Sequence, residues 1–114
     1  MSVEVNYIYR AELERVVDGD TVDMRVDCGF SISTGQRLRL YGINTPEVRG
    51  AEREAGLAAK EYVINRFSEA EEVVIRTIRD KKGKYGRYLA VIYLDGVDLN
   101  EELVQVGHAE RKDY

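Results

Sequence analysis

The stretch "ERVVDGDTVDMRV", residues 14–26, indicates the fold more directly than any other part of the sequence. Apolar and β-branched residues on both sides of the pair Asp18 and Gly19 predict two strands, at Tyr7–Val17 and Thr21–Cys28. In the second strand apolar and charged residues alternate, which is the period of a half-buried strand. Because Asp-Gly is a common two-residue turn, we predict a β-hairpin with one face on the core.

Outward from this hairpin, the sequence predicts a third strand and a helix. A polar loop at Gly29–Gly35 precedes the strand at Gln36–Ile43, whose leucines and arginines fall on opposite faces. From Glu52 to Phe67 the apolar residues recur with helical spacing, which predicts a helix with one apolar stripe. Gly56 weakens this helix slightly. We assign to the stripe Ala55, Ala58, Ala59, Tyr62, Val63, Arg66 and Phe67.

Two further strands and a short helix complete the chain. Strands are predicted at Glu72–Arg79 and Arg87–Leu94, and the second is nearly all apolar, which indicates a central position. Asn100 suits a helix N-cap and Gly107 suits a helix stop, so a short helix is predicted between them. This order fits a mainly β, α+β fold. We predict a five-stranded antiparallel barrel, such as the OB-fold, with one helix between strands three and four.

Length and composition indicate one globular domain covering residues 1–114. Apolar residues make up 44% of the chain and charged residues 33%, and no apolar run is long enough to cross a membrane. Met1–Arg10 lacks the pattern of a secretory signal, so we expect a cytoplasmic protein. A lone Cys28 excludes an internal disulfide, and the sequence has no Cys/His cluster suited to zinc.

The net charge of −4 argues mildly against a nucleic-acid-binding protein, which usually carries a basic face. The distribution of the charges matters more than their sum. Basic residues gather at Arg37 and Arg39 and again at Lys81–Arg87, whereas acidic residues gather elsewhere. The sequence is therefore compatible with one positive face on an acidic protein.

The first group of candidate residues is "DGDT", Asp18–Thr21. Asp-Gly by itself is fully explained as a turn. Asp20 is less well explained, because a second carboxylate two residues away adds repulsion that a turn does not need. Binding of a hard cation, which takes oxygen ligands, accounts better for the pair.

The second group is Arg39 with "INTPE", residues 43–47. The plain interpretation is a solvated arginine followed by a turn, in which Pro46 fixes the backbone. The functional interpretation is a phosphate site, since a guanidinium matches phosphate oxygens. Asn44 and the Thr45 carbonyl would offer oxygens to a cation, and Glu47 would orient or deprotonate a water.

The third group is "DKKGKYGRY", residues 80–88, which is explained most simply as a charged turn containing glycine. Its functional interpretation is a basic loop in which Tyr85 stacks on a base and Arg87 binds phosphate.

Taken together, these groups resemble the staphylococcal nuclease family. The resemblance rests on Asp18–Thr21, Arg39 with Thr45–Glu47, Lys84–Arg87, and the pattern Asn100-Glu101-x-Leu103-Val104-x-x-Gly107, and it covers roughly residues 8–110. Within the family, the sequence looks most like the compact versions found in phages and prophages.

The resemblance implies an OB-fold enzyme that cleaves DNA and RNA with Ca²⁺. It also implies a role for each matching residue: metal ligands Asp20, Asn44 and Thr45; catalytic residues Arg39, Glu47 and Arg87; an outer-shell Asp18; and nucleotide contacts Lys84 and Tyr85. His108, the only histidine, is expected to have a structural or surface role.

Two departures from the family pattern change these expectations. Family members usually have aspartate where this chain has Asn44, so we expect weak calcium binding, at millimolar order, or use of another divalent cation. The chain also stops at Tyr114, without the long final helix of the best-known member, and a homodimer could cover the surface left open.

Three interpretations of function remain after the sequence is read. The first is a metal-dependent nuclease acting on single-stranded DNA or RNA. The second is a non-catalytic OB-fold module that binds single-stranded nucleic acid without cutting it. The third is an accessory protein with a vestigial site. The presence of Arg39, Glu47 and Arg87 together favours the enzyme.

Overall fold

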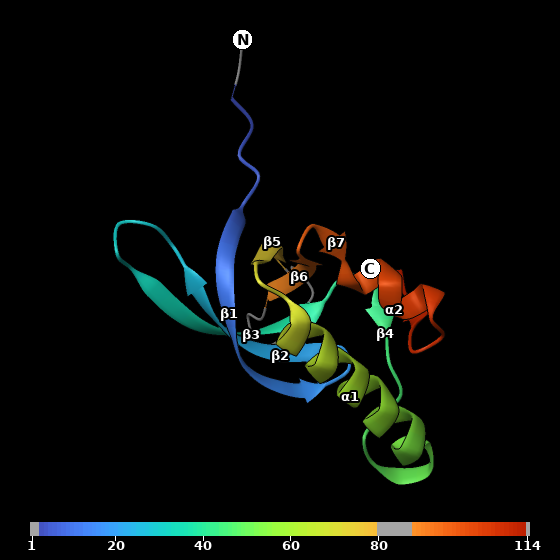
Figure 1. Ribbon diagram of the computed structural model, residues 1–114. Helices are drawn as coiled ribbons and strands as arrows, with labels where there is room; N and C mark the ends of the chain where they lie inside the picture. Colours follow the sequence, from blue (N-terminus) through green and yellow to red (C-terminus); the bar gives the residue numbers. More distant parts are fainter. Residues whose placement is uncertain (1–2, 80–87, 114) are drawn as a thin grey trace.

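The computed structural model describes residues 3–79 and 88–113 and shows a small β-barrel with two helices on its outside (Figure 1). The barrel strands are β1 (Ile8–Asp18), β2 (Thr21–Asp27), β3 (Ser33–Leu40), β5 (Val73–Arg79) and β6 (Tyr88–Leu94). The other elements are β4 (Ile43–Asn44), the 3₁₀ turn η1 (Gly50–Glu52), α1 (Arg53–Glu69), β7 (Val97–Asp98), α2 (Leu99–Gln105) and β8 (Glu110–Arg111).

The barrel has the strand order β3-β2-β1-β5-β6 and closes through pairing of β3 with β6. This arrangement confirms the predicted five-stranded OB-fold barrel, with α1 between the third and fourth barrel strands. The four other strand contacts are antiparallel, but β3 and β6 run parallel. The fully antiparallel prediction was therefore wrong at the closing pair. Strand directions cannot alternate all the way around a ring of five, so one contact must be parallel.

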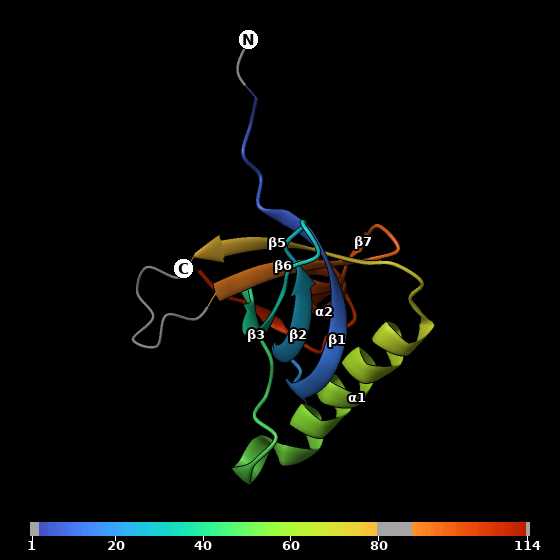
Figure 2. The same cartoon turned by 90° about the vertical axis from the view of Figure 1, so that its left-hand side faces the viewer.

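The core lies inside the barrel and beneath the two helices. Alternate residues of β2 and β3 point into it, and Val22, Met24 and Leu38 are almost completely buried. Helix α1 lies across one side of the barrel, as the two views of the ribbon show (Figure 2). In the part of the chain that the structure describes, no helix is long and apolar enough to cross a membrane.

The buried face of α1 differs in part from the predicted stripe. Ala59, Val63 and Phe67 are buried as expected, whereas Ala55 and Ala58 are exposed. Gly56, which was expected only to weaken the helix, lies on its buried face. The spacing of three and four residues from Gly56 through Phe67 shows that the glycine belongs to the contact surface.

The boundaries of the third strand also differ from the prediction. Strand β3 begins at Ser33, inside the segment assigned to a loop, and ends at Leu40. The chain then turns at Gly42, whose φ of +81° is open to glycine at little cost, and resumes as β4, which pairs with β8. The turn separates Arg39, at the end of the barrel, from the segment that contains Asn44.

Asn100 was predicted to cap helix α2, but this was wrong: the N-cap is Asp98. The Asp98 side chain accepts a hydrogen bond of 3.0 Å from the Glu101 backbone N–H. Asn100 is only 4% exposed and lies inside the first turn, where its side chain contacts backbone groups of the barrel. Gly107 follows the helix with a φ of +85°, which confirms its role as a stop.

Candidate functional site

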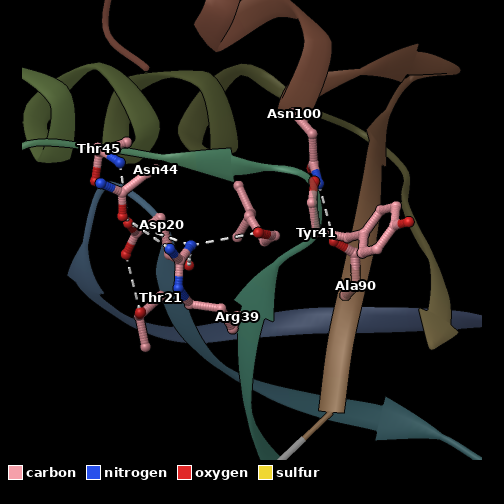
Figure 3. Close-up of polar contacts among 9 residues, drawn as sticks. Asp20, Thr21, Arg39, Tyr41, Asn44, Thr45, Ala90 and Asn100 are labelled. Carbon is pink, nitrogen blue, oxygen red and sulfur yellow. Dashed lines mark hydrogen bonds and ion pairs between the residues drawn. The ribbon is translucent and has the colours of Figure 1, made fainter. Parts of the chain in front are cut away.

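Asp20 lies at the centre of a buried polar cluster, next to the turn between β1 and β2 (Figure 3). The two-residue turn is closed by pairing of Asp18 with Thr21, which confirms the predicted hairpin. One carboxylate oxygen of Asp20 accepts a hydrogen bond of 3.0 Å from the Thr45 backbone N–H. The other accepts one of 3.1 Å from the Thr21 hydroxyl. A single carboxylate thus joins the hairpin to the loop after β4.

Arg39, at the end of β3, is buried against this carboxylate. Its side chain is 8% exposed, and its Nη1 atom lies 3.2 Å from Asp20 Oδ2. Nη2 donates a hydrogen bond of 3.0 Å to Asn44 Oδ1, and Nη1 donates one of 3.3 Å to the Leu40 carbonyl. The guanidinium therefore bridges two oxygens that the sequence assigned to a cation site.

Arg37, two residues earlier on the same strand, provides a contrast. It is exposed and forms a bidentate pair with Asp23, with hydrogen bonds of 2.7 and 3.0 Å. The plain interpretation, a solvated arginine on the outside of a strand, therefore describes Arg37 and not Arg39. Sequence spacing placed both arginines on one face and could not distinguish them.

Close packing at Gly19 holds the hairpin turn in place. A Cβ atom on this residue would lie 2.9 Å from Thr45 Cγ2 and Oγ1, closer than real Cβ atoms come, and a tight 3.0 Å from Ala59 Cβ. A side chain here would therefore force the Thr45 side chain or the turn to shift. Turn chemistry alone explains Gly19 at the level of sequence, and neither this contact nor the role of the Thr21 hydroxyl was predicted.

The two aspartates of the turn have opposite pKa shifts. Burial, followed by contact with the neighbouring Asp20 carboxylate, raises the pKa of Asp18 to about 6. Burial also opposes ionisation of Asp20, but contacts with Asp18, the Thr45 N–H and Arg39 outweigh it and hold the pKa of Asp20 below its usual range. The site thus keeps one firmly ionised carboxylate beside one that binds a proton more readily.

The oxygens of the cluster fit a hard divalent cation. Two buried oxygens, Asp18 Oδ1 and Thr45 Oγ1, have no hydrogen-bond partner in the described parts of the chain. Buried oxygens of this kind normally bind water or a metal ion. Asp20 and the Asn44 side-chain oxygen, which both contact Arg39, are oxygens of the type that a hard cation such as Ca²⁺ takes. Across residues 3–79 and 88–113 no three His, Cys, Asp or Glu side chains gather as metal ligands.

The remaining predicted residues are exposed or lie outside the described residues. Glu47 is exposed on the loop leading to η1 and α1. Asn44 is exposed overall, although its hydrogen bond with Arg39 is partly buried. Lys84, Tyr85 and Arg87 lie outside the described residues, so their assignments stay predictions.

His108 packs against helix α1. Its ring lies against Tyr62 of α1, with a distance of 4.9 Å between the ring centroids. His108 also lines a cavity of about 310 Å³ whose other walls include Asn44, Thr45 and Glu52. The contact with Tyr62 agrees with the structural role predicted for this histidine.

Comparison with known proteins identifies the family. A family model described as staphylococcal nuclease homologue matches residues 37–114. The chain is 32% identical over 107 residues to a thermonuclease of Staphylococcus hyicus, which covers 88% of this chain and 57% of the relative. It is 31% identical over 105 residues to a thermonuclease of Staphylococcus intermedius, covering 90% and 59% of the two chains. An uncharacterised protein of Methanocaldococcus jannaschii is 28% identical over 131 residues, covering 94% and 61%.

The chain spans about 57 to 61% of the length of these relatives. The matched region begins at Arg37 and includes the Arg39 end of β3, the Asn44 loop and both helices. It therefore contains the part of the polar cluster contributed by β3 and β4. The chain belongs to the staphylococcal nuclease family.

Proposed function

We propose that this protein is a divalent-metal-dependent nuclease that hydrolyses phosphodiester bonds of DNA or RNA. The observation that carries the proposal is the convergence of Asp20, Arg39, Asn44 and Thr45 in one cluster, joined by hydrogen bonds and an ion pair. These residues come from two separate segments of the chain. A relative described as a thermonuclease, to which the chain is 32% identical, supports this class of activity.

Two arginines would bind the phosphate. Arg39 is held in a fixed orientation by Asp20 and the Leu40 carbonyl, so its fork is ordered before substrate arrives. On binding, its Nη2 atom would exchange Asn44 Oδ1 for a phosphate oxygen. Arg87 would bind a second oxygen. Both contacts would strengthen as negative charge grows on the equatorial oxygens in the transition state.

Glu47 would position the attacking water and accept its proton. Glu47 follows Thr45, whose backbone donates to Asp20, by two residues, and its exposed carboxylate can reach a water that approaches from solvent. The pentavalent transition state needs this water in line with the leaving oxygen, so correct placement of Glu47 matters as much as its basicity.

The metal ion would be held by Asp20, the Asn44 side-chain oxygen and the Thr45 carbonyl. Asp18 would lie in the outer shell of the ion. A bound Ca²⁺ would offset the negative charge of the phosphate. The amide of Asn44 contributes no charge, so we expect binding weaker than an aspartate at that position would give. Lys84 and Tyr85 would contact the nucleotide, with the tyrosine stacking on a base.

Cleavage of single-stranded DNA and of RNA by the purified protein tests this proposal. We expect cleavage with millimolar-order Ca²⁺, none in EDTA, and at least about 100-fold slower cleavage by Glu47→Gln and by Arg87→Ala. Arg37→Ala is the matched control, since Arg37 is an exposed arginine on the same strand as Arg39 and pairs with Asp23. This variant should cleave at nearly the rate of the unmodified protein.

The same experiment separates the other interpretations. Binding of single-stranded nucleic acid without cleavage in any divalent cation would indicate a binding module. Neither binding nor cleavage would indicate a vestigial site. Equal losses in Arg37→Ala and Arg87→Ala would show that general positive charge, and not a built site, determines the activity.

A further inference from the structure

Among the described residues, the Glu47 side chain differs from those of Asp20 and Arg39 in its contacts. It is exposed, and within the described residues no hydrogen bond or ion pair holds its carboxylate. By contrast, Asp20 and Arg39 are fixed by several contacts each. The close contact that the structure does describe for Glu47 is made by its backbone.

The backbone of Glu47 lies directly on α1 at Gly56. A Cβ atom at Gly56 would be 2.1 Å from the Glu47 carbonyl oxygen, 2.4 Å from its carbonyl carbon and 2.8 Å from the Val48 nitrogen. Any side chain at Gly56 would therefore push the peptide bond between Glu47 and Val48 away from the helix by about 1 Å, because nonbonded heavy atoms do not approach so closely. The neighbouring Pro46 restricts the backbone on the other side of Glu47.

The position of Gly56 inside a helix needs a structural explanation. Glycine in the interior of a helix costs stability relative to alanine, and Gly56 is in the first half of a 17-residue helix otherwise rich in good helix formers. A glycine that is in contact with another segment of the chain has a packing reason. The contact with the Glu47–Val48 peptide supplies that reason.

We propose that Gly56 is the positioning residue for Glu47: by lacking a side chain, it lets the loop rest on α1 and fixes where the Glu47 carboxylate emerges. This inference rests on the proposed function. The inference also gives α1 a role in the reaction, because the helix supports the segments that carry site residues. The helix contacts the Glu47 loop at Gly56, and through Ala59 it contacts the hairpin turn that carries Asp20.

A double-mutant cycle between Gly56→Ala and Glu47→Gln tests the inference. Gly56→Ala alone should lower kcat by about 100-fold, the scale expected for a misplacement of about 1 Å, and leave KM and the metal concentration for half-maximal activity nearly unchanged. In the Glu47→Gln background, the same alanine should lower kcat by less than about threefold, because the group that it displaces is already disabled.

Leu57→Ala is the matched control. Leu57 is the next residue of α1, is 39% exposed, and has no part in the cluster. Its variant should keep full kcat. Thermal unfolding and circular dichroism of all variants show whether each is folded at the assay temperature, and kcat is compared only between folded variants.

The outcomes separate this inference from the proposed function. If Glu47→Gln abolishes cleavage while folded Gly56→Ala keeps full kcat, or if the two losses simply multiply, the positioning role is wrong and the nuclease stands. If the unmodified protein does not cleave, the proposed function is wrong. The contact is then judged by the amide chemical shifts of Glu47 and Val48: large changes in Gly56→Ala but not in Leu57→Ala support it, and unchanged shifts overturn it.

Discussion

Two buried polar groups lie near the C-terminal end of β3, and they differ in how completely their hydrogen-bonding atoms are satisfied. Asn100 uses both ends of its amide. Nδ2 donates to the Tyr41 and Ala90 carbonyls at 2.9 Å each (Figure 3). Oδ1 accepts from the Ile92 N–H at 3.2 Å. The cluster around Asp20 contains two carboxylates and a buried guanidinium, and among the described residues two of its buried oxygens have no hydrogen-bond partner.

This difference indicates separate purposes. A buried neutral side chain whose donors and acceptor are hydrogen-bonded within the protein stabilises the fold. Such a side chain has little capacity left to bind a ligand. Buried charges with spare oxygens cost folding free energy unless something else binds there. We therefore assign Asn100 to the fold and the Asp20 cluster to function. The predictions below test this division.

The largest expected effect is on catalysis, from Arg39→Lys. Lysine keeps the positive charge beside Asp20 but loses the planar fork, so it cannot hold Asp20 and a phosphate oxygen together. We expect cleavage to fall by at least about 100-fold, while the protein remains folded. Steady-state kinetics with saturating metal, together with thermal unfolding, measure both. Near-normal activity would show that Arg39 serves only as a buried ion pair.

The second effect is on stability, from Asn100→Ala. The variant leaves the Ile92 N–H and the Tyr41 carbonyl without their amide partner inside the protein, which should cost about 2 to 3 kcal/mol of unfolding free energy. Urea unfolding measures this loss. Cleavage per folded molecule should change little. A loss of cleavage as large as that of Arg39→Lys would erase the distinction between the two regions.

The third prediction concerns Asn44→Asp. Adding a negative charge beside Arg39 and the other oxygens should tighten divalent-cation binding roughly tenfold, or about 1.4 kcal/mol. Calcium titration followed by calorimetry or by cleavage measures the change. Asp23→Asn, on the outer face of β2 against Arg37, is a control that should leave metal affinity unchanged. Tight, micromolar-order binding by the unmodified protein would contradict the reasoning.

The smallest effect is expected where α1 and α2 meet. The Glu102 carboxylate accepts from the Tyr62 hydroxyl at 2.6 Å and from Arg66 at 2.7 Å. Burial opposes its ionisation, but these two partners hold the pKa of Glu102 below its usual value. A carboxyl whose folded-state pKa is depressed stabilises the protein above its unfolded-state pKa of 4.5, and this contribution is lost as pH falls through the folded-state value.

Glu102→Gln should therefore lower the unfolding free energy at pH 7 by about 1 kcal/mol. The difference from the unmodified protein should shrink as the pH is lowered below 4.5. Urea unfolding at several pH values gives this dependence. Glu69→Gln is the control, since Glu69 is an exposed partner of the same Arg66 and should have little effect at any pH. A difference that does not vary with pH would show that packing, and not charge, makes the contribution.

Particular residues show how far the sequence could predict the fold. The hairpin at Asp18 and the stop at Gly107 were predictable because each depends on local backbone preferences. The N-cap at Asn100 was predicted wrongly. Asp98 and Asn100 are both good capping types, and which one caps depends on which side chain the barrel buries.

The candidate site also has features that the sequence predicted and features that it could not predict. The residue types at Asp20, Arg39 and Asn44 indicated phosphate and cation chemistry from their order in the sequence alone. That Arg39 is buried and Arg37 exposed could not be predicted, because both alternate identically along β3. Their difference arises where the hairpin turn and the Asn44 loop cover one end of the strand and leave the rest open.

The sequence by itself determined the elements with a clear period, the turns that glycine and aspartate favour, and the chemical types gathered near them. These features depend on neighbours a few residues apart, whose geometry the chain fixes directly. The tertiary structure alone decided the parallel closure of β3 on β6, the burial of Arg39, and the close contacts at Gly19 and Gly56. Each of these depends on two segments far apart in sequence, and only packing in three dimensions determines whether they meet.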